Sequence, residues 1–168
     1  MARTTTLKGK PLDLEGPELK VGDAAPDAVL KKSLVDDFRI SETKGKTRVF
    51  SVVPSLDTPV CAEQTRRFNK ELAAMPNVTC YTISCDLPMA MNRFCGAEGI
   101  ETGKIVPLSD HKEVAFGKAY GTLIPSLRIL CRAVFVVDAA DKLRYVEYVP
   151  EVASHPNYEA ILACLKSL

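Results

Sequence analysis

A short apolar run, residues 47–53 (TRVFSVV), constrains the fold more than any other part of this sequence. It is rich in β-branched residues and almost continuously apolar, which is typical of a central strand covered on both faces. Pro54 ends the run, and apolar or small side chains then recur at helical spacing until Pro76, at positions 61, 65, 68, 72 and 75. A buried strand that leads directly into an amphipathic helix predicts an α/β fold.

Strand and helix patterns alternate along the rest of the chain. The expected strands are 78–84, 105–108, 133–137 and 143–149, and the expected helices are 88–98, 113–120 and 157–168. Residues 138–142 (DAADK) carry a hairpin signal, so this end of the sheet is antiparallel and the sheet is mixed. The turn signal Lys8-Gly9-Lys10 lies between two short strand patterns, 4–7 and 11–14, and predicts an N-terminal hairpin. We expect a single domain over residues 1–168, with residues 1–15 as a hairpin extension.

Size and charge exclude several classes of function. The chain has 168 residues, and its 22 basic and 21 acidic side chains give a formal charge of +1. This balance offers no broad electrostatic surface for nucleic acid or for an anionic membrane. No run of apolar residues approaches the roughly 18 that a membrane-spanning helix needs, and the first residues lack the apolar stretch of a secretory leader. We therefore expect a cytoplasmic protein without nucleic-acid or membrane partners.

Six cysteines are too few for a disulfide scaffold in a chain of this length, and no two of them form a CxxC pair. A structural zinc site needs ligands two to four residues apart, whereas His111 and His155 have no cysteine near them in sequence. We expect neither a metal nor a cofactor. Cys80 and Cys85 differ by five positions, so an extended chain would point them to opposite faces. Most of these thiols, including Cys131 and Cys164, are expected to be buried.

Cys61 is the best candidate for a nucleophile. Thr58 can serve as the N-cap of the helix after the central strand, and Pro59 then occupies the favoured first helical position. Cys61 falls in the first turn, where unpaired N–H groups and the helix dipole stabilise a thiolate. Without further context, the alternatives are a buried small hydrophobic residue for Cys61 and a simple helix cap for Thr58.

A helix terminus alone cannot activate a cysteine. A free thiol with a pKa of about 8.5 is only about 3% thiolate at pH 7, and a helix terminus contributes roughly 0.3 to 1 kcal/mol toward the charged form. A nearby cation is therefore expected. Arg66 and Arg67 lie one turn along the same helix, whereas Arg132 leads into an apolar strand and must point to a rim or a site.

Four segments of the sequence resemble the bacterial thiol peroxidases, which are atypical two-cysteine peroxiredoxins. They are PSLDTPVC (54–61), RFCGAEG (93–99), RAVFVVD (132–138) and VPEVASHPNYEAILACL (149–165). The resemblance covers nearly the whole chain and implies a thioredoxin-like three-layer fold, in which helices flank a mixed central sheet. Residues 121–131 (GTLIPSLRILC) depart from the family pattern because they lack its Gly-Pro-Leu loop, which leaves the width of the pocket open.

The resemblance also implies an activity: reduction of hydrogen peroxide and alkyl hydroperoxides by a homodimer that thioredoxin recycles. Cys61 would be the peroxidatic residue, which becomes a sulfenic acid and then forms an intramolecular disulfide with Cys95. Further site residues would be Thr58 and Arg132, which shape the peroxide pocket, Pro54, which shields the sulfur, and Val60, which contacts substrate.

Formation of this disulfide would require local unfolding, because the two cysteines lie in different expected helices and a disulfide needs Cα atoms within about 7 Å. Apart from the resemblance, the residues around Cys95 favour a packed helix cysteine near a glycine over a functional thiol. Two alternatives to a peroxidase remain. The first is a non-enzymatic redox sensor or adaptor that uses the same cysteine pair, and the second is a general disulfide oxidoreductase, which the absence of CxxC disfavours.

Overall fold

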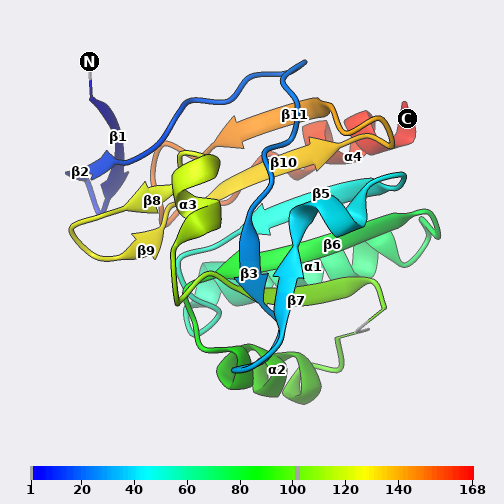
Figure 1. Ribbon diagram of the computed structural model, residues 1–168, viewed down its shortest axis with the longest axis horizontal. Coiled ribbons are helices and arrows are strands. Elements are labelled where there is room, and N and C mark those ends of the chain that lie inside the picture. Colours follow the sequence, from blue (N-terminus) through cyan, green and yellow to red (C-terminus); the bar gives the residue numbers. More distant parts are fainter. Residues whose placement is uncertain (1, 101–102) are drawn as a thin grey trace.

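The computed structural model describes residues 2–100 and 103–168, and its core is a mixed sheet (Figure 1). Within these residues the sheet has seven strands. Their order is β11 (Leu143–Tyr148), β10 (Ala133–Val137), β5 (Thr47–Val52), β6 (Val78–Ser84), β7 (Ile105–Ser109), β3 (Val29–Lys31) and β4 (Asp37–Arg39). The central strands β5, β6 and β7 are parallel, and the outer strands pair antiparallel. The expected mixed α/β sheet is therefore confirmed.

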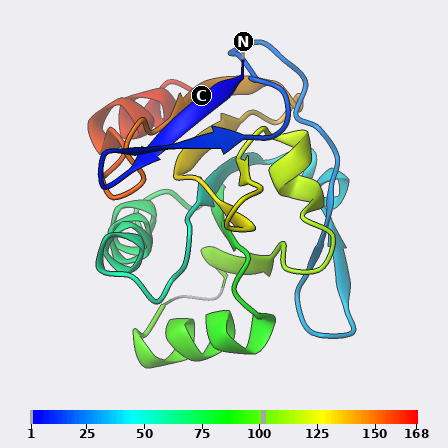
Figure 2. The ribbon, with the colours of Figure 1, turned by 90° about the vertical axis from the view of Figure 1, so that its left-hand side faces the viewer.

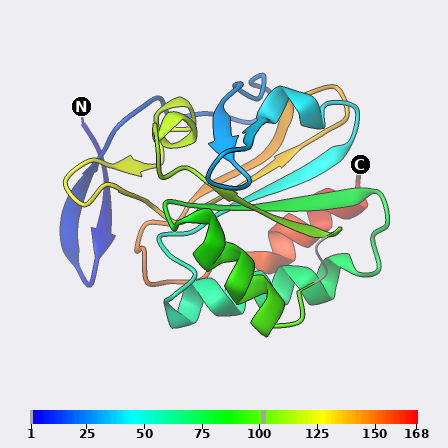
Figure 3. The ribbon, with the colours of Figure 1, turned by 60° about the horizontal axis from the view of Figure 1, so that its bottom comes forward.

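Helices cover both faces of this sheet, which gives three layers (Figures 1 and 3). One face packs against α1 (Pro59–Leu72), α2 (Pro88–Ala97) and α4 (Tyr158–Lys166). The other packs against α3 (Ala115–Ala119) and a small hairpin of β8 (Leu123–Ile124) and β9 (Ile129–Leu130). Successive residues of β10 alternate between the two cores, as the two-residue period of a strand requires.

Most expected elements occur close to their expected positions, and the differences have local causes. The helix α1 ends at Leu72, so Met75 is not helical as its spacing suggested but packs against the core from the following turn. The helix α3 begins only at Ala115, because Val114 has a left-handed backbone with φ of 47°. The strands β3, β4, β8 and β9 and a short 3-10 helix, Ile40–Thr43, were not predicted, since two to four residues are too few to show a period.

The N-terminal hairpin is confirmed and is fastened to the body of the protein. Its strands β1 (Arg3–Leu7) and β2 (Lys10–Leu14) pair antiparallel beside the loop that follows β11 (Figure 2). The carboxylate of Glu151 accepts hydrogen bonds from the Thr6 hydroxyl (2.7 Å) and from the N–H groups of Lys8 (2.9 Å) and Gly9 (3.1 Å). Together these bonds fix the hairpin turn to the loop between β11 and α4.

No helix among the described residues is long and apolar enough to cross a lipid bilayer.

The Glu151 anchor predicts a specific loss of stability in acid. Hydrogen bonds from Thr6 and from backbone N–H groups lower the pKa of Glu151 to about 2, from an ordinary value of 4.5. Between these two pH values the unfolded chain binds more protons than the folded one, so this contribution is present above pH 4.5 and is lost as the pH falls toward 2. We expect Glu151→Gln to be less stable at pH 7 and to lose less stability than the wild type between pH 4.5 and 2.

Urea unfolding at a series of pH values from 7 to 2 measures this effect. Glu159→Gln is the matched control, because the Glu159 side chain is 83% exposed and is paired only loosely, at 3.7 Å from Arg67. The same pH dependence in the wild type and in Glu151→Gln would contradict the prediction.

Candidate active site

Cys61 lies where the central strand β5 passes into the helix α1. Residues 53–58 connect the two elements, and Cys61 is the third residue of the helix, after Pro59 at the first position. Its side chain is fully buried among Val53, Leu56 and Met91. The first turn of α1, to which Cys61 belongs, leaves backbone N–H groups without helical acceptors. The structure thus places Cys61 at a buried helix N-terminus, as the sequence predicted.

Arg132 is the cation at this site. Its Nη2 atom lies 3.2 Å from Cys61 Sγ, and the side chain is only 1% exposed. The register of β10 explains this position, because Val134 and Val136 face the helices α1 and α4 and the two-residue period sends Arg132 to the same side. An arginine that leads into a core strand therefore reaches across the sheet edge to the start of α1.

The remaining donors of Arg132 bind neutral oxygens. Its Nη1 donates to Gln64 Oε1 (2.7 Å), and its Nε donates to the carbonyl of Val152 (2.9 Å). Among the described residues no carboxylate forms an ion pair with this guanidinium. Burial of an unpaired cation is costly. Of the groups that contact this guanidinium, the Cys61 sulfur is the one that can carry a negative charge.

Gln64 and Val152 are site residues that the sequence reasoning missed. Gln64 lies on α1 three residues after Cys61, is fully buried and donates through Nε2 to Ser51 Oγ on β5 (2.8 Å). Its amide oxygen is thereby aimed at Arg132. A polar glutamine on the apolar face of a helix was the available signal, whereas a backbone acceptor such as the Val152 carbonyl leaves no trace in the sequence.

Thr58 occupies the N-cap position of α1 by backbone geometry, but its side chain does not cap the helix. Its hydroxyl donates to the carbonyl of Ser55 (2.9 Å), and the side chain is exposed. Pro54 is buried at the start of the same loop, and Val60 is half-buried in the first turn of α1. The expectation of a side-chain cap at Thr58 is therefore wrong, because the hydroxyl shapes the loop before the helix instead.

Cys95 is a second buried thiol near this site but has a different environment. It lies on α2, is 2% exposed and packs with the sheet and with Phe68 of α1. Burial raises the pKa of Cys95, so the group is a protonated thiol at neutral pH. Phe94 packs against this cluster and also against the cluster that holds Cys61. Both cysteines are free thiols in the structure.

The other four cysteines have environments that suppress nucleophilic reactivity. Burial raises the pKa of Cys80, Cys85 and Cys131 to about 12 in each case, and it also raises the pKa of Cys164. Cys80 packs on the α1 side of the sheet and Cys85 against the core on the α3 side, so the expected opposite orientation is confirmed. Cys164 is only half-buried, a small departure from the expected core position.

The two alternative cations on α1 are engaged elsewhere. Arg66 forms a two-point ion pair with Glu98 at the end of α2, with distances of 2.6 and 3.1 Å. Arg67 lies 3.5 Å from Glu71 and 3.7 Å from Glu159. Both arginine side chains are largely exposed, so Arg132 alone of the three candidates is directed at the sulfur.

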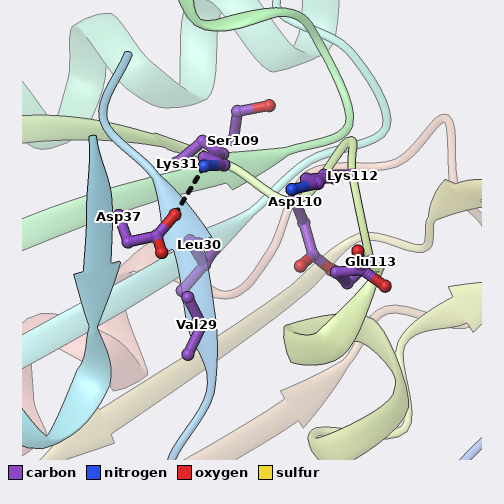
Figure 4. Close-up of a pocket in the computed structure, with 8 residues that line it drawn as sticks. All are labelled: Val29, Leu30, Lys31, Asp37, Ser109, Asp110, Lys112 and Glu113. Carbon is purple, nitrogen blue, oxygen red and sulfur yellow. Dashed lines mark ion pairs between the residues drawn. The ribbon is translucent and has the colours of Figure 1, made fainter. Parts of the chain in front are cut away.

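A small cavity on the opposite face of the sheet has a structural origin. It measures about 90 Å³ and lies between β3 and the segment that enters α3 (Figure 4). The strands β3 and β7 share a single residue pair, Lys31 with Ser109, and this short pairing leaves the gap. Asp110 at its edge accepts the N–H groups of Phe116 (3.1 Å) and Gly117 (2.8 Å), and burial raises the pKa of Asp110 to about 6. No cysteine lines the cavity, so we assign it no part in the thiol chemistry.

The fold and the buried cysteine-arginine pair define a thioredoxin-like protein of the peroxiredoxin class. The family model described as Redoxin matches residues 20–162. The chain is 52% identical to the thiol peroxidase of Oceanobacillus iheyensis over 160 residues, which are 95% of this chain and 96% of that protein. It is 48% identical to the thiol peroxidase of Bacillus subtilis over 163 residues, which are 97% of this chain and 96% of that protein.

Solved structures agree with these relatives. A peroxiredoxin-like protein from Aquifex aeolicus superposes with a TM-score of 0.90 at 42% identity and covers 99% of this chain and 98% of its own. A thiol peroxidase from Chromobacterium violaceum shares the fold, with a TM-score of 0.87 at 21% identity over 98% of this chain and 95% of its own. The chain belongs to the Redoxin family and, within it, to the thiol peroxidases. It is therefore a peroxidase enzyme of the peroxiredoxin kind.

The role of Arg132 can be separated from its contribution to stability. We expect Arg132→Lys to lower the rate constant of Cys61 with peroxide by about 10²- to 10³-fold, because lysine cannot bind the sulfur, Gln64 and Val152 in one planar arrangement. Arg48→Lys is the matched control, since Arg48 is also fully buried but binds Asp141 at the far end of the sheet. Stopped-flow measurements of the reduced proteins provide the rates.

Both substitutions should lower the melting temperature, and only Arg132→Lys should slow the reaction. Equal rates in Arg132→Lys and the wild type would refute this role for the guanidinium.

Proposed function

We propose that Cys61 is the peroxidatic nucleophile of this peroxidase, that Arg132 and Thr58 form its peroxide pocket and that Cys95 is the resolving thiol. The observation that carries the proposal is the 3.2 Å contact between Arg132 Nη2 and Cys61 Sγ in a buried site, with no carboxylate paired to that guanidinium among the described residues. Among the six cysteines, Cys61 is the one with this contact. It is accordingly the thiol suited to attack at neutral pH.

In the first step, the Cys61 thiolate attacks the terminal oxygen of the hydroperoxide. A sulfur–oxygen bond forms as the oxygen–oxygen bond breaks, and the electron pair of that bond leaves with the alkoxide or hydroxide. Solvent supplies the proton that converts this leaving group to an alcohol or water, and Cys61 becomes a sulfenic acid. Arg132 and the N–H groups of the first helical turn stabilise the charge as it moves from sulfur to oxygen.

The pocket around this reaction would include three residues near the start of α1. Pro54 is buried in the loop of residues 53–58 and would shield the sulfur from bulk water. Val60 is half-buried and would contact the organic group of an alkyl hydroperoxide. The exposed hydroxyl of Thr58 could turn from the Ser55 carbonyl to the peroxide, which supports a role in binding as well as in loop structure.

In the second step, the Cys95 thiol would attack the sulfenic sulfur, with release of water and formation of a disulfide. Cys61 and Cys95 lie in separate helices and in separate clusters, with Phe94 packed against both. Because a disulfide needs Cα atoms within about 7 Å, the first turn of α1, part of α2 or both would unfold locally. A thiol reductant then restores both thiols by disulfide exchange.

The family supports a proposal about the reductant, the substrates and the cellular setting. Its members' peroxidase activity implies a peroxide substrate and a thiol reductant. We propose that thioredoxin is this reductant, that hydrogen peroxide and alkyl hydroperoxides are the substrates, and that the enzyme acts as a cytoplasmic homodimer. Residues 1–168 would form a single domain, with residues 1–15 as its hairpin extension.

Serine variants separate the two cysteine roles. We expect Cys61→Ser to abolish peroxide consumption, because the nucleophile is lost. Cys95→Ser should complete the first step at the wild-type rate and then accumulate sulfenic acid without turnover. Mass spectrometry after one equivalent of peroxide identifies the oxidised residue, and a coupled assay with thioredoxin measures turnover. Cys80→Ser is the matched control and should behave as the wild type; retained activity in Cys61→Ser would overturn the proposal.

Amide hydrogen exchange tests the local unfolding. The disulfide form should exchange faster than the reduced form at Ala62 and the residues of α1 directly after it, in the second half of α2, or in both, because these amides lose their helical acceptors. The amides of β10 are the internal control and should exchange equally in both forms. Identical exchange around Cys61 and Cys95 in the two forms would argue against the required opening.

A further inference from the structure

Asp86 joins the loop of residues 53–58, which precedes Cys61, to the segment that leads into α2. It lies two residues after the end of β6 and two residues before Pro88, the first residue of α2. Its Oδ1 accepts the Ser55 hydroxyl at 2.7 Å, and its Oδ2 accepts the Leu56 N–H at 2.8 Å and the Ser84 hydroxyl at 2.7 Å. One half-buried carboxylate therefore holds two consecutive residues of the loop before Cys61.

The effect of Asp86 reaches the helix start through Ser55. The Ser55 hydroxyl donates to Asp86 and accepts the N–H of Asp57 (3.1 Å), and the Ser55 carbonyl accepts the Thr58 hydroxyl (2.9 Å). Asp57 and Thr58 are the residues directly before α1. A continuous series of hydrogen bonds thus runs from Asp86 to the N-terminus of the helix that presents Cys61.

The backbone of Asp86 is also fixed by the ends of β6 and β7. Its backbone carbonyl accepts the Ser109 hydroxyl from β7, and its own N–H donates to Ser84 Oγ (3.1 Å). The helix that follows carries Met91, which packs directly on Cys61. If the start of α1 opens so that Cys61 can approach Cys95, the loop must withdraw from Asp86. The carboxylate therefore opposes the motion that the resolving step requires.

We propose that Asp86 is a positioning residue that stabilises the closed arrangement in which Cys61 contacts Arg132. By doing so it favours attack on peroxide and slows the formation of the disulfide. This inference rests on the proposed function, specifically on the pairing of Cys61 with Cys95. A carboxylate accepts all three hydrogen bonds through its two oxygens. An asparagine can keep its oxygen for Leu56 and Ser84 but then presents an NH₂ group to Ser55. The Ser55 hydroxyl must then accept instead of donate, and the loop loses its charge-assisted hydrogen bonds to a carboxylate.

Two opposite effects are expected in Asp86→Asn. The rate constant of Cys61 with peroxide should fall roughly tenfold, because the closed arrangement is less populated. The disulfide should form from the sulfenic acid at least as fast as in the wild type, because opening is easier. Less Cys61 should therefore be overoxidised to sulfinic acid at high peroxide, with a several-fold higher concentration needed for half-overoxidation.

The control is Asp138→Asn at the opposite end of the sheet. Asp138 is also a half-buried carboxylate that accepts backbone N–H groups, from Ala140 (2.9 Å) and Lys142 (3.0 Å). The Asp138→Asn variant should change the melting temperature without changing the peroxide rate or the rate of disulfide formation. Ser55→Ala is a milder variant, because it removes one hydrogen bond to Asp86. It should shift both rates in the same directions as Asp86→Asn, by a smaller factor. The inference can therefore be tested even if Asp86→Asn folds poorly.

Rapid-mixing measurements with hydrogen peroxide give both rates, and the Cys95→Ser background isolates the first. A peroxide rate in Asp86→Asn and Ser55→Ala equal to that of the wild type would overturn the inference, as would an equal fall in Asp138→Asn. An unchanged ratio of disulfide to sulfinic acid would also overturn it. Absence of a Cys61–Cys95 disulfide in the wild type would instead refute the proposed function. This separate measurement distinguishes failure of the proposed function from failure of the inference about Asp86.

Discussion

The contact between Arg132 and Cys61 is the interaction on which the active site depends. A guanidinium that is almost completely withdrawn from water must find an opposite charge, and its other donors reach only the neutral oxygens of Gln64 and Val152. In the proposed mechanism, a thiolate at Cys61 would stabilise the arginine as much as the arginine would stabilise the sulfur. Oxidation to the proposed sulfenic acid would remove the negative charge, which gives a physical reason for the site to loosen once peroxide has reacted.

The sheet brings these groups together because its central strands are parallel. The carboxyl ends of β5 and β6 lie at the same edge of the sheet, and each continues into a polar segment that serves one of the two cysteine helices. β5 leads to the loop before Cys61, and β6 leads to Asp86 and then to α2. The antiparallel neighbour β10 begins at this same edge, which is why Arg132 enters the site from the opposite chain direction.

Local sequence patterns were sufficient for the main strands, the three long helices and the position of Cys61, since each rests on contacts between near neighbours. Arg132 was one of three candidate cations, favoured over Arg66 and Arg67 because it leads into an apolar strand and because of the family resemblance. The register of β10 then explains why its side chain reaches Cys61. The polar Gln64 on an apolar helix face was a signal that the sequence reasoning missed. The Val152 carbonyl and the anchoring carboxylate of Asp86 could not be predicted, because they act through contacts between segments far apart in the sequence. The short strands β3, β4, β8 and β9 were not predicted for a different reason. Contacts with distant parts of the chain, rather than a repeating sequence pattern, fix their hydrogen bonds.

The hairpin at the amino terminus has a practical consequence. Thr6 accepts the N–H of Val152 at its carbonyl (2.8 Å), and the carbonyl of Val152 in turn holds Arg132. Three successive hydrogen bonds thus connect Thr6 to the sulfur of Cys61, although 55 positions separate the two residues. A fusion partner or affinity tag joined tightly to this end would strain the hydrogen bonds that hold Val152 against Arg132. The carboxyl terminus, exposed beyond the last turn of α4, is the safer place to attach one.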